Sequence, residues 1–171
     1  MYPSFDYTRG TLLELFTRMQ FPERTRHESA LIRDFLLAHI HEYDPYQFSL
    51  RVGQGLPPDP SHLPGVQANT QHSSKKRIDM LAWQGDQATI FEVKARANPA
   101  AIGQLATYRH LWLEEHPDAR EPILAVIARS TDPDTRRVLE AAGITLYLYE
   151  IIPEEEAGAD PGAAAGENAP V

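Results

Sequence analysis

The sequence predicts an α/β domain in which a mixed β-sheet is covered by helices on both faces. Two apolar runs rich in β-branched and aromatic residues flank Gly85-Asp86 and predict a β-hairpin over residues 76–95. Both faces of this hairpin carry mostly apolar side chains, so each face needs a covering layer. The apolar run 122–128 predicts a central strand of the same sheet.

Helices on either side of the hairpin supply the covering layers. Apolar residues recur at helical spacing over residues 23–41, and a proline separates this helix from a shorter one at 11–20. Asn98-Pro99 is typical of a helix start, with an N-cap before a proline at the first helical position, and predicts the helix 98–115. The remaining expected elements are a strand at 46–52, a helix at 132–143 and a strand at 144–152.

The stretch 53–74 interrupts the regular pattern. Its repeated glycine and proline residues argue against any regular element, and we expect an irregular loop insertion over 54–74. A loop this long inside a compact domain usually has a function or is disordered. A DNA-contacting flap, a partner-docking loop and a disordered insertion all remain open.

Length and composition indicate one folded domain with a flanking segment at each end. A chain of 171 residues can bury one core of ordinary size. We expect residues 1–22 to form an aromatic-rich arm and a short helix, and residues 23–152 to form the domain. Residues 153–171 are rich in alanine, glycine and glutamate and should be a disordered acidic tail, because they cannot bury enough apolar surface.

Composition also excludes several classes of function. The formal net charge of −8 argues against a protein that coats nucleic acid by bulk electrostatics. The chain has no cysteine, which excludes disulfides and cysteine-zinc sites, and no phosphate-binding or serine-hydrolase motif. No apolar run reaches the roughly 18 residues of a membrane span, and we see no secretion signal. We therefore expect no membrane partner and a cytoplasmic location, bacterial or, for a viral protein, within the host.

The hairpin brings three charged side chains together. Gly85-Asp86 suits a two-residue type II′ turn, which places Asp79 opposite Glu92 and puts Lys94 on the same face. Two ionised carboxylates this close repel each other unless a cation lies between them. Carboxylate oxygens suit Mg²⁺ or Mn²⁺, so the pattern predicts a divalent-metal site.

The same alternation assigns the apolar side chains of the hairpin to two faces. One face is expected to carry Ile78, Met80, Phe91 and Val93, and the other Leu81, Trp83 and Ile90. The three charged residues then lie at one end of an otherwise apolar face, where a cleft would open.

The acidic pair and the lysine also resemble a known motif. Asp79, followed 13 residues later by Glu92-Val93-Lys94, is similar to the D…(D/E)-x-K motif of the PD-(D/E)XK nuclease superfamily. The resemblance covers roughly residues 24–149. One departure is that Ile78 precedes Asp79 where the motif name has a proline.

Two further features strengthen this resemblance. Gln104-Leu105-Ala106-Thr107-Tyr108 resembles the Q-x-x-x-Y element found in the exonuclease branch of the superfamily. By this resemblance Gln104 is an accessory residue that helps to hold the attacking water, and Tyr108 contacts the substrate. Glu28 resembles the additional acidic metal ligand that many members supply from their first helix.

The resemblance implies a restriction-endonuclease-like fold and a metal-dependent DNA nuclease. Asp79 and Glu92 would be ligands of Mg²⁺ or Mn²⁺, with Glu28 as an outer ligand. Lys94 would orient the attacking water and stabilise charge in the transition state. The substrate-binding residues expected beside this site are Lys75, Lys76 and Arg77.

Each assignment has a structural alternative. Thr25 and Glu28 also fit a capping box, and Gln104 with Tyr108 also fits an exposed glutamine beside a half-buried tyrosine. The basic run 75–77 also fits a solvated surface. For the whole protein, two alternatives to a nuclease remain: a nuclease-fold structural or assembly protein, of a viral particle or a DNA-processing complex, and a non-cleaving DNA-binding module. DNA is the expected partner, and a homo-oligomer or larger assembly is left open.

Overall fold

A six-stranded mixed sheet forms the centre of the computed structural model, which describes residues 5–8, 21 and 24–149. The strands follow one another across the sheet in chain order, antiparallel from β1 to β4 and parallel from β4 to β6. The elements are β1 (Phe5–Tyr7), α2 (Arg26–His39), β2 (Tyr46–Val52), α3 (Pro64–Ser74), β3 (Lys76–Gln84), β4 (Gln87–Arg96), α4 (Ala100–Glu115), β5 (Ile123–Ser130), α5 (Pro133–Ala141) and β6 (Thr145–Leu148).

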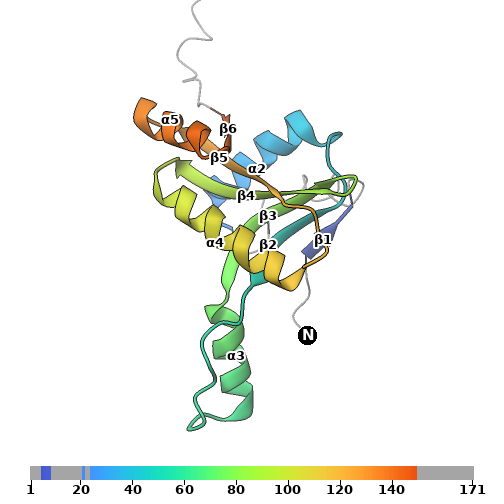
Figure 1. Cartoon of the computed structure of the whole chain (residues 1–171), viewed down its shortest axis with the longest axis vertical. Coiled ribbons are helices and arrows are strands. Elements are labelled where there is room, and N and C mark those ends of the chain that lie inside the picture. Colours follow the sequence, from blue (N-terminus) through green and yellow to red (C-terminus); the bar gives the residue numbers. More distant parts are fainter. Residues whose placement is uncertain (1–4, 9–20, 22–23, 150–171) are drawn as a thin grey trace, which may run out of the picture.

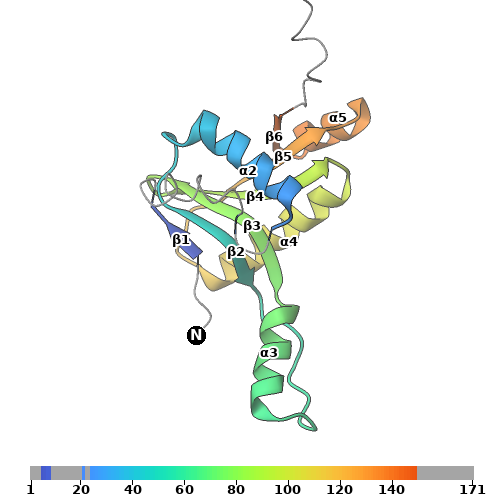
Figure 2. The same ribbon diagram turned by 180° about the vertical axis from the view of Figure 1, so that it is seen from behind.

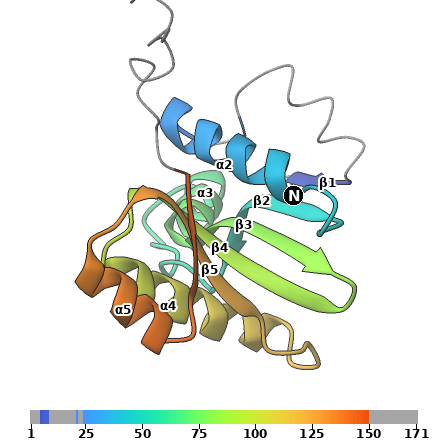
Figure 3. The ribbon, with the colours of Figure 1, turned by 90° about the horizontal axis from the view of Figure 1, so that it is seen from above.

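Helices cover both faces of the sheet, as the two apolar faces of the hairpin require. Helix α2 lies on one face, while α4 and α5 lie on the other (Figures 1, 2 and 3). The element order and the sheet confirm the predicted α/β fold class, a mixed central sheet flanked by helices. Among the described residues, no helix has both the length and the apolar character needed to cross a membrane.

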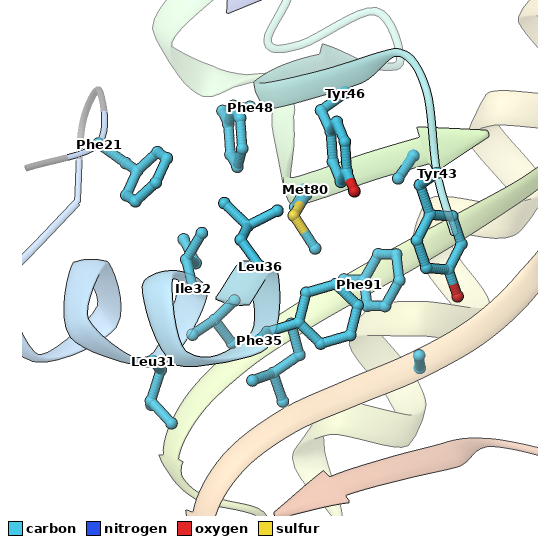
Figure 4. Packing of buried hydrophobic residues seen from close by; sticks show 14 of the residues in the cluster. Phe21, Leu31, Ile32, Phe35, Leu36, Tyr43, Tyr46, Phe48, Met80 and Phe91 are labelled. Carbon is cyan, nitrogen blue, oxygen red and sulfur yellow. The ribbon is translucent and has the colours of Figure 1, made fainter. Parts of the chain in front are cut away.

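Two hydrophobic clusters, one on each face, hold these layers together. Under α2, the Phe35 ring lies 5.0 Å from the Phe91 ring and 5.1 Å from that of Tyr147, measured between centroids. Figure 4 shows how Phe35 and other apolar side chains of α2 meet side chains of the strands, among them Phe91 and Met80. On the opposite face, Leu105 of α4 and Leu139 of α5 belong to a second cluster with the inner strands.

Most predicted elements are present, with shifted ends. β2 begins and ends at the predicted residues. α2 begins at Arg26 rather than residue 23, because Thr25 is its N-cap. β1 had not been predicted as a strand; its backbone pairs with β2 and adds an edge to the sheet. The helix expected at 11–20 and the tail 153–171 lie outside the described residues.

The hairpin register is the predicted one wherever β3 and β4 pair, and the pairing stops before the far end of the hairpin. Gly85 has φ 62°, as the first position of a type II′ turn requires, and the pairs run from Gln84–Gln87 to Met80–Phe91. On the other side of β3, the ladder with β2 skips the position of Ser49, which has φ 57°.

This break corrects one prediction about the faces of the hairpin. Ile78 belongs to the cluster on the α4 side and Met80 to the cluster on the α2 side, although simple alternation places them together. The residue between them, Asp79, is unpaired in this ladder and lies opposite Ser49, whose φ is 57°, and the strand presents different faces on the two sides of this position.

The prediction of an irregular loop over 54–74 is wrong for its second half. Residues 64–74 form α3, with Pro64 in the first turn, where its missing N–H is not needed. The glycines and prolines are concentrated before Val66, and the rest of the helix contains none. No residue of α3 is buried, and the helix projects beyond the end of the sheet (Figures 1 and 2).

Candidate active site

The candidate site lies where β3 and β4 stop pairing. Asp79 immediately precedes Met80, the first residue of β3 that pairs with β4. Glu92 and Lys94 lie on β4, between β3 and the parallel strand β5. Asp79 is 6% exposed and Glu92 is 2% exposed, so both carboxylates are removed from water. Lys94 Nζ lies 2.6 Å from Glu92 Oε1 and keeps about a quarter of its side chain exposed (28%). The two carboxylates and the ammonium group are therefore brought to one place, as the turn chemistry predicts.

Asp79 does not form a ladder pair with Glu92, although the extended register predicts one. Its Oδ2 accepts a hydrogen bond from the backbone N–H of Val93 at 2.8 Å, so the carboxylate bridges the two strands where the ladder ends. The charge of Asp79 nonetheless acts on Glu92, whose pKa it raises.

A buried arginine compensates the charge of Asp79. Arg24 Nη1 lies 2.5 Å from Asp79 Oδ1, and its Nη2 donates to Ser49 Oγ at 3.2 Å and to the Asp79 carbonyl at 3.3 Å. The Arg24 side chain is fully buried, so this is a desolvated ion pair in which removal of either partner leaves an unpaired charge. The irregular conformation of Ser49 positions the hydroxyl that the guanidinium contacts.

Glu92 carries the strongest electrostatic perturbation of the acidic pair. Burial and the nearby negative charge of Asp79 raise its pKa from 4.5 to about 7, against the opposing effects of Lys94 and the Tyr108 hydroxyl. Glu92 Oε2 is buried and has no hydrogen-bond partner among the described residues. An unsatisfied buried carboxylate oxygen is costly, and a bound cation would satisfy it.

Helix α4 contributes the two residues of the Q-x-x-x-Y element. Gln104 Nε2 lies 3.4 Å from the Tyr108 hydroxyl, and Tyr108 is buried, which raises its pKa together with the charges of Glu92 and Asp79. Gln104 is half-buried. Tyr108 therefore lies on the Glu92 side of the site. Gln104 contacts Tyr108 and is connected to the site through it.

Glu28 lies in a capping box at the start of α2. Its Oε2 accepts from the Thr25 N–H at 2.9 Å, and the Thr25 hydroxyl accepts from the Glu28 N–H at 3.2 Å. No group of three or more His, Cys, Asp or Glu residues in the described part of the chain could hold a metal ion. Glu28 is thus not brought together with Asp79 and Glu92, and its role as an outer ligand stays a prediction.

The predicted substrate-binding cations lie at the junction between α3 and β3. Lys75 is the C-cap residue of α3, and Lys76 and Arg77 are the first residues of β3. Arg51 of β2 lies directly opposite Arg77 in the antiparallel ladder. Four cations therefore gather near the start of β3, and the nearest of them in sequence, Arg77, lies two residues before Asp79. The sequence had pointed only to the run 75–77.

Sequence reasoning missed the role of Arg24 and of Ser49. Arg24 precedes the N-cap of α2 and is one of several arginines in that region, so no local pattern distinguishes it. Its partner Asp79 is 55 residues away in the chain. A buried carboxylate requires compensation, but that rule does not say which cation supplies it.

The donor set of the site is compatible with Mg²⁺ or Mn²⁺. These ions prefer oxygen ligands, and Mg²⁺ commonly uses only one or two carboxylates while retaining several waters. Asp79 and Glu92 supply two carboxylates, and the unpaired Glu92 Oε2 offers lone pairs with no donor assigned to them. The two residues therefore fit an ion of this class without a third protein carboxylate.

Comparisons with known proteins find similarity among solved structures alone. No protein-family model matches the sequence, and no curated protein matches it. A repair endonuclease from Pyrococcus abyssi is 17% identical with a TM-score of 0.44, over 77% of this chain and 49% of that one. An EndoMS–dsDNA2 complex is 17% identical with a TM-score of 0.43, over 77% and 48% of the two chains. The chain thus spans about half the length of these two proteins.

Proposed function

We infer that the chain is a metal-dependent DNA nuclease that hydrolyses phosphodiester bonds at the Asp79–Glu92–Lys94 site. The observation that carries this inference is the buried, unpaired Glu92 Oε2 beside a second buried carboxylate and a lysine. A purely structural cluster would be expected to satisfy each carboxylate oxygen. The similarity of these residues to the D…(D/E)-x-K motif supports DNA as the substrate.

In this proposal Asp79 and Glu92 hold the divalent ion. When bound, Mg²⁺ or Mn²⁺ supplies Lewis-acid polarisation of the phosphoryl group and lowers the pKa of a bound water. The backbone N–H of Val93 and the guanidinium of Arg24 fix the orientation of the Asp79 carboxylate. The remaining lone pairs of Asp79 stay available, because a carboxylate accepts at about four positions.

Lys94 is the group that acts on the substrate. Its ammonium is bound to Glu92 and yet partly exposed, so it can donate a hydrogen bond to the attacking water or to a phosphate oxygen. Hydrolysis joins the water oxygen to phosphorus, breaks one P–O ester bond and leaves a proton of the water on the released oxygen. The Lys94 ammonium would stabilise the negative charge that builds up on the phosphoryl oxygens. Tyr108 and Gln104 support the Glu92 side of the site.

A non-cleaving DNA-binding module is the second candidate, and one observation favours it. Both Asp79 oxygens already accept hydrogen bonds from Arg24 and Val93, which compensates the carboxylate without a metal. Such a protein would retain the fold and the basic residues beside the site. It would bind DNA and leave it intact.

Cleavage of linear and circular duplex DNA with Mg²⁺ or Mn²⁺ tests the proposal. We expect wild-type protein to cut, and Asp79→Asn and Lys94→Met to reduce the rate at least about a hundredfold, as loss of one transition-state donor does. Asp86→Asn, an exposed carboxylate in the hairpin turn, is the matched control and should cut normally. DNA that is bound and left intact by all four proteins would favour the binding module.

A further inference from the structure

The helix that projects from the domain adds no buried side chain to the hydrophobic clusters. α3 has 11 residues, none of them buried, and is about 16 Å long at 1.5 Å per residue. It lies beyond the end of the sheet with the loop that precedes it (Figures 1 and 2). We call residues 53–75 the α3 arm.

The α3 arm is braced at its base. Gly55 has φ 72°, and a Cβ placed on it would lie 2.1 Å from the Gln71 carbonyl oxygen, so the loop packs against the helix backbone. The Leu56 N–H donates to Ser74 Oγ and the Gly53 N–H to Glu115 Oε1, each at 2.7 Å. The arm therefore projects in a defined direction, and its partner meets a preformed helix.

Positive charge gathers where the α3 arm joins the sheet. Arg51, Lys75, Lys76 and Arg77 form a basic cluster in a chain whose net charge is −8. Arg51 and Arg77 are direct cross-strand neighbours, so two of these side chains lie side by side on adjacent strands. The sole acidic residue from Gly53 to Arg77 is Asp59, whose carboxylate accepts hydrogen bonds from Ser61. A polyanion would be attracted to this cluster.

The side chains of α3 fit a polar partner. Asn69, Thr70 and Ser73 are exposed, and the helix contains no charged residue between Pro64 and Ser74. Val66, 46% exposed, is its one large apolar residue, so α3 lacks the apolar stripe with which helices dock into protein grooves. Asparagine, threonine and serine are side chains that read base edges in the major groove, which is wide enough to admit a helix.

We propose that the α3 arm binds duplex DNA, with α3 in the major groove and the basic cluster on the flanking phosphates. Asp79 lies two residues beyond Arg77 on the same strand, about 7 Å away at the usual rise, so a phosphate held by the cluster is delivered next to the carboxylate pair. That the ligand is DNA rests on the proposed nuclease function. It adds that the substrate is double-stranded and that the arm positions it.

The salt dependence of binding tests the basic cluster without requiring cleavage. Wild-type protein is titrated onto a fluorescent duplex and onto one of its single strands, in EDTA, over a range of KCl concentrations. Each phosphate contact contributes about −0.9 to the slope of log K against log salt, so Lys75→Ala/Lys76→Ala should flatten the duplex slope by about 2. Arg136→Ala/Arg137→Ala removes the same charge from the exposed face of α5, at the other end of the molecule, and should leave the slope unchanged (Figure 1).

The second arm of the experiment tests groove entry by α3. Dimethyl sulfate methylates guanine N7, which lies in the major groove, and wild-type protein should protect guanines in its footprint. Gly55→Ala clashes with the Gln71 carbonyl and displaces the arm, so protection should be lost. Gly65→Ala meets no atom within 4 Å and should retain protection. Circular dichroism establishes that both variants remain folded.

The outcomes separate this proposal from the nuclease itself. Flattened salt dependence together with lost N7 protection supports it, even if no cleavage is found. An unchanged slope in Lys75→Ala/Lys76→Ala, equal affinity for single strands, or unprotected N7 atoms with wild-type protein overturns it, even if Asp79→Asn abolishes cleavage. Self-association that depends on the arm, without DNA binding, would overturn it too and assign the helix to a protein interface.

Discussion

Arg24 compensates the charge of Asp79 from inside the protein. Removal of one partner of a buried ion pair leaves the other as an unpaired buried charge. Arg24→Ala should therefore lower the free energy of unfolding by about 3–5 kcal/mol in metal-free buffer. Arg26→Ala, an exposed arginine in the first turn of α2, should change it by less than about 0.5 kcal/mol. Urea denaturation in EDTA measures both.

Arg24→Ala also tests whether a metal ion can compensate the charge of Asp79 in place of the guanidinium. If Asp79 is a ligand, excess Mg²⁺ should recover more stability in Arg24→Ala than it adds to wild type, because the uncompensated carboxylate gains a cation. Equal Mg²⁺ effects on the two proteins would count against Asp79 as a ligand.

Glu92 predicts a pH dependence of stability in the metal-free protein. Its pKa is 4.5 as an ordinary carboxyl and about 7 in the folded state. The folded state therefore binds the proton more tightly, and the stability it gains is present below about pH 4.5 and is lost as the pH rises through about 7. Glu92→Gln should remove this decline, which denaturation curves at several pH values will detect. A wild-type decline that persists in Glu92→Gln must come from another group.

At the scale of the element, α2 depends on its capping box. Thr25→Ala and Glu28→Ala each remove one of the two reciprocal hydrogen bonds and should each lower stability by about 1 kcal/mol. If capping is the whole role of Glu28, both variants keep the Mn²⁺ affinity of wild type. Loss of Mn²⁺ affinity in Glu28→Ala but not in Thr25→Ala would support the predicted role of Glu28 as an outer metal ligand.

The hairpin is the element that could be predicted in most detail. Gly85 permits the II′ turn, the turn sets the register, and the register brings Asp79 to the region of Glu92 and Lys94. Each step is local, so the sequence contains it. The end of the ladder at Asp79 could not be predicted in this way, because it depends on the strained Ser49 of a different strand.

At the scale of the whole molecule, local patterns predicted layers and missed long-range partners. The order of helices and strands follows from periodicity and caps, and the helical layers follow from the two apolar faces that the sheet must bury. The role of Arg24 was missed because its partner, Asp79, lies 55 residues away in the chain. α3 was missed because the many breakers that precede it obscured a short polar helix that buries nothing.

The central claim is that Asp79 and Glu92 together hold one divalent cation. Titration with Mn²⁺, followed by electron paramagnetic resonance, tests this most directly, because it needs no knowledge of the preferred DNA. We predict one bound Mn²⁺ per wild-type chain, lost in Asp79→Asn and in Glu92→Gln, and retained in Asp86→Asn. Equal uptake by all four proteins, or none by wild type, would contradict the claim.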